Sequence, residues 1–304
     1  MSAPPSPGLV AGYFHRNPHL KFIAPAMTVM LVLSVIPTVF LLVVSLTNYQ
    51  LGWEPSRAKF VGLDNFIRLF SGADTDFWHS VWISLAFMVL ATGLELILGF
   101  GIAKVLNDSE SRLKPFVIGI MIIPLAITPS IAAQMWKLIL NSEYGILNAF
   151  LDATMGLRVT WLGPDVAFWS VLMVDLWQFT PFVALILYAG LRSMPEEPFE
   201  AASLDGASAW QQFIHLTLPM LRKLIFLALL LRAVDALKLF DTAFVLTQGG
   251  PGNATMFLSL HIFRLANAQN GLIGRASAVA IVLLVLTIVV SRVLIAQQRK
   301  GEDS

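Results

Sequence analysis

The chain has 304 residues, of which 57% are hydrophobic and only 13% are charged, and its mean hydropathy is +0.74. An average soluble domain carries about 25% charged residues, so this composition excludes an ordinary soluble enzyme and favours a membrane protein. The net charge of +1 gives no reason to expect nucleic-acid binding. The absence of cysteine excludes disulfides, thiol nucleophiles and cysteine-ligated metals.

Six hydrophobic stretches are long enough to cross a bilayer, which requires about 20 apolar residues of helix. The sequence therefore predicts an all-α, polytopic membrane protein with six transmembrane helices. The first stretch exceeds the roughly 7–15 apolar residues of a signal peptide, so we expect it to be retained. The six stretches are 22–47, 80–106, 115–140, 167–191, 217–240 and 276–296.

These stretches define the expected domain organisation. One transmembrane domain extends over 22–296, and it is flanked by a flexible cytoplasmic tail at 1–21 and a cytoplasmic tail at 297–304. Within the third stretch, Pro124 and Pro129 indicate either an ordinary kink or a break in the helix beside a transport pathway.

The positive charges predict the orientation of the chain, because cytoplasmic segments of membrane proteins carry an excess of Lys and Arg. Six spans place both termini on one side, which we expect to be the cytoplasm. Tryptophans near the proposed outer boundaries agree with this orientation, because interfacial positions favour aromatic rings. They are Trp53, Trp78, Trp82 and Trp161. The predicted inner side carries Arg16, Lys21, Arg112, Lys114, Arg192, Arg222, Lys223, Arg299 and Lys300, and the outer side Arg57, Lys59, Arg68, Arg158, Arg264 and Arg275.

The segment between the fourth and fifth stretches has strong local signals. Ser193 with Glu196, and Ser208 with Gln211, have the spacing of capping boxes, so two short helices are expected. The turn signal at Asp205-Gly206 ends the first helix, which is predicted to run through 199–204.

The charge of this segment favours a protein partner. It contains no Lys or Arg between Arg192 and Arg222, and it carries Glu196, Glu197, Glu200 and Asp205. An amphipathic helix on the inner leaflet is the alternative, but such helices are usually rich in Lys and Arg.

The same segment resembles the "EAA" loop of permease subunits of binding-protein-dependent ABC importers. The resemblance rests on several residue types at fixed spacings within 193–219. It departs at Arg222-Lys223, where many relatives have a proline. Ala207 also matches the motif. The residues that the resemblance implies to be the ATPase-coupling residues are Glu200, Ala201, Ala202, Asp205, Gly206, Leu218 and Pro219.

A second stretch, Leu239–Gly252, is similar to the "FD…LT-GGP" region of maltose- and glycerol-phosphate-type carbohydrate permeases. The resemblance implies the type I ABC importer permease fold and a role in importing a sugar, sugar derivative or polyol. Glycerol-phosphate or another non-sugar solute is the alternative, and an ion-coupled secondary transporter is a more distant one.

The resemblance also implies partners and a location. The chain would form the translocation pathway with a second homologous permease and would bind two copies of a cytoplasmic ATPase that holds ATP and Mg. An extracytoplasmic solute-binding protein would deliver the solute, and the assembly would lie in the bacterial inner membrane.

The chain itself is not expected to be an enzyme. It contains no G-x-x-x-x-G-K-[ST] phosphate loop, H-E-x-x-H or G-x-S-x-G motif. No cofactor or metal is expected in this chain, because its histidines are scattered along the sequence. They are His15, His19, His79, His215 and His261.

Ionisable groups inside the predicted spans form the candidate substrate pathway, because each costs roughly 2.5–3.5 kcal/mol at mid-bilayer unless it faces protein or water. Arg232, Asp235 and Lys238 recur every three residues, and Glu95 is expected to pair with Arg232. This group either lines the pathway or fixes helix packing. The other candidates are Asp175, Trp177, Gln178 and Asp241, and the first three offer the ring face and polar groups that suit a sugar.

Overall fold

The computed structural model describes residues 20–267 and 271–300. Residues 1–19 of the predicted N-terminal tail and 301–304 of the predicted C-terminal tail therefore lie outside the described residues. The helices of the predicted apolar stretches are α2 (Leu20–Ser45), α4 (Thr75–Asp108), α5 (Lys114–Ala126), α6 (Pro129–Ile139), α8 (Ala167–Arg192), α11 (Leu218–Leu237) and α14 (Ile273–Lys300). The shorter elements are η1 (Pro55–Arg57), α3 (Asp64–Phe70), α7 (Ile146–Met155), α9 (Glu197–Leu204), α10 (Ala209–Gln212), the π-helical turn η2 (Phe213–Thr217), α12 (Asp241–Leu246) and α13 (Leu258–Asn267).

The helical architecture agrees with the predicted spans. Within the described residues, five helices are long and apolar enough to cross a membrane, and the count becomes six if α5 and α6 together form one span. The two are bent by 99°, so the third stretch is not one straight helix and the interpretation as an ordinary kink is wrong. Pro129 opens α6, where its missing N–H leaves no helical hydrogen bond unmade.

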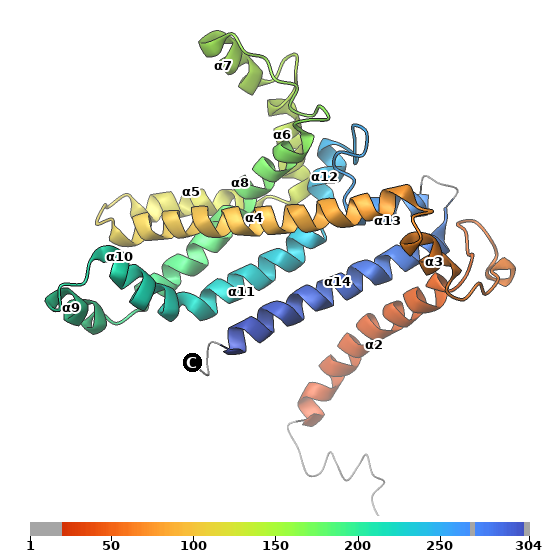
Figure 1. The fold of residues 1–304 in the computed structure, drawn as a ribbon, viewed down its shortest axis with the longest axis horizontal. Coiled ribbons are helices and arrows are strands. Elements are labelled where there is room, and N and C mark those ends of the chain that lie inside the picture. Colours follow the sequence, from red (N-terminus) through yellow and green to blue (C-terminus); the bar gives the residue numbers. More distant parts are fainter. Residues whose placement is uncertain (1–19, 268–270, 301–304) are drawn as a thin grey trace, which may run out of the picture.

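The helices pack around α4 and α8, which cross at an angle (Figure 1) and make the most extensive contact between two helices of the described chain. Gly99 of α4 lies directly against α8, since a Cβ there would come within 3.1 Å of the Ala184 backbone nitrogen. Gly190 of α8 allows a similar approach by Leu221 and Leu224 of α11. Helices α4, α8 and α11 therefore form one closely packed block.

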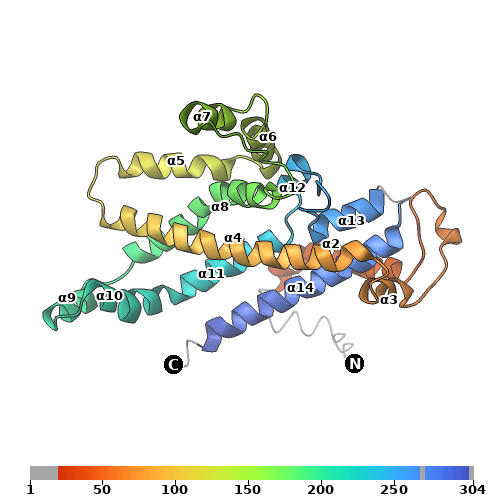
Figure 2. The ribbon, with the colours of Figure 1, turned by 45° about the horizontal axis from the view of Figure 1, so that its top comes forward.

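Short helices lie at opposite ends of this block. Figures 1 and 2 show α9 and α10 at one end and α3 and α13 at the other. Helix α4 is roughly 50 Å long, which exceeds a bilayer core of about 30 Å, so it must protrude from the membrane. Helix α2 packs mainly along α14 and exposes most of its apolar surface.

The tight contact at Gly99 gives a first prediction. Replacing Gly99 with Val should force α4 and α8 apart and lower the free energy of unfolding by about 1–3 kcal/mol. Gly101 lies two residues along the same helix, and a Cβ added there would meet no atom within 4 Å, so Gly101→Val is the matched control. Thermal unfolding in one detergent compares them, and equal melting temperatures would contradict this packing.

Candidate functional site

The residues of the predicted coupling loop form an exposed helical hairpin, α9–α10, defined here as 197–212. Its two helices are joined by a turn in which Gly206 has φ +76°, a conformation that favours glycine. None of the residues of α9 or α10 is buried. A rigid but exposed hairpin of this kind is suited to docking against another protein.

Side-chain hydrogen bonds hold the two helices of the hairpin together. Gln212 Nε2 donates to Ser203 Oγ at 3.0 Å and to the Ala207 carbonyl at 3.2 Å. The predicted capping box of Ser208 and Gln211 is confirmed. These contacts allow the hairpin to move as a single body.

The other predicted capping box is wrong. Ser193 ends α8, and its hydroxyl donates to the Gly190 carbonyl rather than capping a following helix. Helix α9 instead begins after Glu196, whose side chain makes no cap. Helix α8 continues to Arg192, and Ser193 is its C-terminal capping residue.

The coupling residues occupy two places in the structure. Most lie on the exposed hairpin, whereas Leu218 and Pro219 open α11 beyond the π-helical turn η2. A cavity of about 890 Å³ separates the hairpin from the ends of α4 and α8. The residues on the hairpin and its turn are Glu200, Ala201, Ala202, Asp205, Gly206 and Ala207.

A buried ion cluster joins the three central spans. Arg232 of α11 donates to both oxygens of Glu95 on α4, each at 2.7 Å, which confirms the expected pair. It also donates to Asp175 of α8 at 2.8 Å and to Asp235 at 2.7 Å. Its guanidinium carbon lies 4.0 Å from the centre of the Phe179 ring. One arginine therefore ties α4, α8 and α11 together.

The members of this cluster differ in their access to solvent. Glu95, Asp175 and Arg232 are at most 3% exposed, whereas the Asp235 side chain is 60% exposed. Asp175 therefore contacts Arg232 rather than an open surface. Lys238, at the end of α11, and Asp241 are exposed like Asp235.

Gln178 supports the broken span. Its Nε2 donates to the Ile127 carbonyl at 2.9 Å, which lies in the gap between α5 and α6. Neighbouring Trp177 is only partly buried and meets Trp136 of α6 edge to face, with ring centres 5.6 Å apart. The three predicted neighbours in α8 thus have different surroundings.

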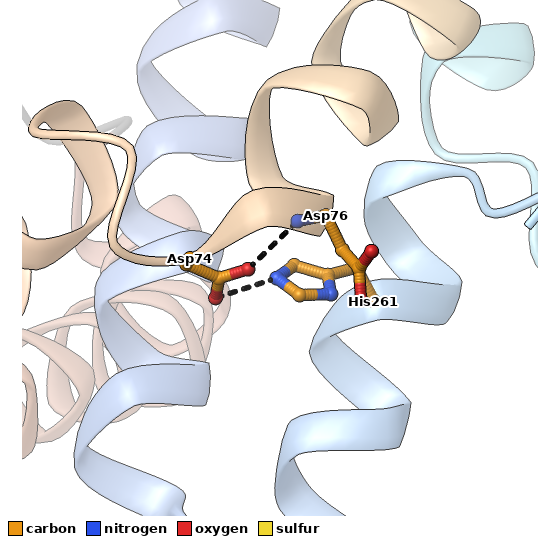
Figure 3. Close-up of side chains that lie close together, drawn as sticks. All are labelled: Asp74, Asp76 and His261. Atoms are coloured by element: carbon orange, nitrogen blue, oxygen red, sulfur yellow. Dashed lines mark hydrogen bonds and ion pairs between the residues drawn. The ribbon is translucent and has the colours of Figure 1, made fainter.

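At the opposite end, five polar residues form what we call the α4–α13 clasp: Asp74, Asp76, Asn253, His261 and Arg264. His261 Nε2 lies 3.1 Å from Asp74 Oδ2, and Figure 3 marks this contact with a dashed line. Asp76 accepts from Asn253 Nδ2 at 2.8 Å and forms an ion pair with Arg264. The sequence did not predict this group, because its two ends lie more than 170 residues apart in the chain. The available signal was Asp74 itself, a helix-capping residue just before a span.

The clasp contains the donor types of a metal site, but its carboxylates are already engaged. Asp74 Oδ1 accepts from the backbone amides of Asp76 and Phe77, and Oδ2 contacts His261. Both oxygens of Asp76 are bound by Asn253 and Arg264. The arrangement therefore fits a structural connection between the start of α4, α13 and the loop that precedes it.

Charge interactions stabilise the ionised form of Asp74. Burial raises its pKa, but the hydrogen bond and charge of His261 and the two backbone amides outweigh burial, so the pKa lies below its ordinary value. Asp74 consequently serves both as the N-cap of α4 and as an anionic partner of α13.

The chain is similar to known membrane components of transport systems. The family model described as "Binding-protein-dependent transport system inner membrane component" matches residues 8–300. The trehalose/maltose transport system permease protein MalF of Thermococcus litoralis is 38% identical over 268 residues, covering 87% of this chain and 88% of that protein. The sulfoquinovosyl glycerol transport system permease protein SmoG of Agrobacterium fabrum is 30% identical, covering 89% and 87%.

The fold is also similar to that of solved structures. A crystal structure of a bacterial ABC transporter involved in the import of the acidic polysaccharide alginate matches with a TM-score of 0.79 at 22% identity, covering 95% of this chain and 98% of that chain. A structure of a bacterial alginate ABC transporter with an alginate pentasaccharide-bound periplasmic protein gives a TM-score of 0.81 at 21% identity, with coverage of 95% and 96%.

The ion cluster predicts a large effect of removing its cation. Arg232→Met should lower stability by about 3–5 kcal/mol, because it leaves Glu95 and Asp175 buried without their partner. Asp235→Asn, which changes the exposed member, should cost much less. The yield of folded chain and its melting temperature in detergent measure both effects. Similar losses in the two variants would show that burial of the charges does not matter.

The clasp predicts a pH-dependent contribution. Asp74→Ala should lose a helix cap worth about 1 kcal/mol, whereas Asp74→Asn keeps the cap and removes only the charge. Because folding lowers the pKa of Asp74, its charge stabilises the protein above the unfolded pKa of about 3.9 and loses this effect as the pH falls through the folded value. The difference in melting temperature between wild type and Asp74→Asn should therefore be present at pH 7 and shrink below about pH 4. A difference that grows at low pH would contradict this assignment.

Proposed function

Because the chain belongs to the family of binding-protein-dependent transport system inner membrane components, and is thus a non-catalytic ABC importer permease whose ATPase is a separate subunit, we propose that it imports a sugar, sugar derivative or polyol and is coupled to its ATPase through the α9–α10 hairpin. The exposed hairpin is the single observation that carries the coupling assignment. It presents Glu200, Asp205 and Gly206 at one end of the block formed by α4, α8 and α11.

The mechanism follows from a rigid hairpin joined to a rigid block. Closure of the ATPase pair on ATP would draw the hairpins of the two permeases together. Helix α11 continues from the hairpin through η2, and Arg232 links α11 to α4 and α8. A displacement of the hairpin would thereby move all three spans and change which side of the membrane the pathway faces.

The proposed assembly contains a second homologous permease, two copies of the ATPase and an extracytoplasmic solute-binding protein. The hairpin end would face the cytoplasm, and both termini would lie on that side. The excess of Lys and Arg on the predicted inner segments supports this orientation. The α4–α13 clasp would then lie on the extracytoplasmic side.

The names of relatives support a carbohydrate as the solute, since they include permeases for trehalose/maltose and sulfoquinovosyl glycerol. Trp177 offers an aromatic surface, and Asp235, Lys238 and Asp241 offer exposed polar groups near the end of α11. These four are the candidates for direct contact with the solute. Asp175 and Gln178 would act indirectly, by positioning Arg232 and the α5–α6 break.

Reconstitution of the complete importer tests this function. The chain is purified from its native host with its associated subunits, and uptake of radiolabelled maltose, trehalose and glycerol-3-phosphate is measured in proteoliposomes with the native binding protein. Vanadate-sensitive uptake of a sugar is expected. Uptake of glycerol-3-phosphate alone would support the non-sugar alternative. Vanadate-insensitive uptake driven by an ion gradient would indicate a secondary transporter.

Variants of the hairpin test the coupling. Gly206→Val should uncouple uptake from ATP hydrolysis while the protein still inserts, because φ of +76° strains a β-branched residue and distorts the docking surface. Replacing Glu200 with a bulky residue such as Trp should have a similar effect. Gly101→Val, on an open face of α4, is the control. Uptake per ATP at the wild-type ratio in both hairpin variants would refute the coupling role.

A further inference from the structure

Three aromatic rings connect the hairpin to a membrane span. Trp210 of α10 and Phe213 of η2 have ring centres 5.4 Å apart, and Phe213 lies 5.1 Å from Phe100 of α4. Such contacts stabilise a pair beyond the burial of its apolar area. We call these three residues the aromatic ladder.

The ladder is well placed to carry force because little else ties the hairpin to α4. No residue of α9, α10 or η2 is buried, and the 890 Å³ cavity lies between the hairpin and the ends of α4 and α8. The chain itself joins the hairpin to α8 through residues 193–196 and to α11 through a π-helical turn, but not to α4. Wider turns of this type occur often at functional positions, and this one interrupts the regular helix between hairpin and span.

Phe100 lies in a part of α4 that is firmly attached to the rest of the block. Gly99, the preceding residue, contacts the backbone of α8, and Glu95 lies five residues earlier and holds Arg232. A push on Phe100 would therefore reach both α8 and the ion cluster. The ladder thus adds a side-chain link to α4 beside the covalent links of the hairpin to α8 and α11.

We propose that Phe213 and Phe100 are positioning residues for energy coupling: their contact makes α4 follow the hairpin when the ATPase closes. This inference rests on the proposed coupling function of the hairpin. It predicts that the hairpin and the end of α4 keep a constant separation through the transport cycle. Without the ring contact, the hairpin would move relative to α4, and its displacement would reach the block only through its chain links to α8 and α11.

Spin-label distances measure this separation directly, and the absence of cysteine from this chain means that labels on it attach only at introduced positions, with the partner subunits used in cysteine-free form. Glu110→Cys, just beyond α4, and Glu197→Cys, at the start of α9, carry the labels in the complete importer in lipid nanodiscs. Distances are recorded without nucleotide and after trapping with ATP and vanadate. The wild type should give the same distance in both states.

In Phe213→Ala and in Phe100→Ala, trapping should change the distance and populate a separated state. The ratio of separated to attached molecules should increase by roughly two- to twelvefold, the range expected for loss of an aromatic pair. The double variant should shift the ratio no further than Phe213→Ala alone, because each single substitution already removes the Phe100–Phe213 contact. Phe213→Leu, which keeps an apolar side chain, should shift the ratio in the same direction by less and covers the case in which the alanine variants do not assemble.

Phe226→Ala is the matched control, since this α11 ring lies outside the ladder and contacts Arg222. It should behave as the wild type. The proposal is overturned if trapping changes the distance in the wild type, or if the ladder variants keep one distance in both states. Failure of the proposed function gives a different result, because no ATPase copurifies and vanadate traps no nucleotide.

Discussion

The contact of Arg232 with Glu95 and Asp175 is the constraint on which the arrangement of the spans depends. Separate ionisable groups at mid-bilayer would each cost roughly 2.5–3.5 kcal/mol, so they are tolerated when they meet one another away from lipid. Three charges on three different helices can meet only where α4, α8 and α11 lie close together with these side chains facing one another. The close approaches at Gly99 and Gly190 are the steric counterpart of this requirement, since bulkier residues there would hold the helices too far apart.

A block fixed in this way can transmit motion without deforming. The hairpin at one end and the clasp at the other are both attached to it, and α4 extends to both. The peripheral helices are attached to the block by fewer contacts. Helix α2 packs against α14. At the α5–α6 break, the Ile127 carbonyl accepts a hydrogen bond from Gln178. Motion within the assembly is therefore expected between the block and these outer elements or the partner permease.

The sequence predicted the features that depend on local composition and spacing. Span-length apolar runs, the Ser208 capping box and the Asp205-Gly206 turn follow from short-range rules, and the Arg232–Glu95 pair follows from the cost of an unpaired charge. Features that need three-dimensional information were missed. Ser193 ended one helix instead of starting the next, because tertiary packing extends α8, and the clasp joins residues whose separation in sequence carries no pairing signal.

The polar residues of α8 show why a polar group in a span does not by itself identify a substrate site. Asp175, Trp177 and Gln178 look like one sugar-binding set in sequence, but they point to an arginine, an aromatic ring and a backbone carbonyl, respectively. In lipid, a broken helix exposes carbonyl groups that water cannot satisfy, so a span that bends needs side-chain donors such as Gln178. Polar residues near a helix break or a buried charge therefore satisfy that carbonyl or charge and are not free to bind a solute. Residues such as Asp235 and Asp241, whose side chains remain exposed, are the stronger candidates for contact with a solute.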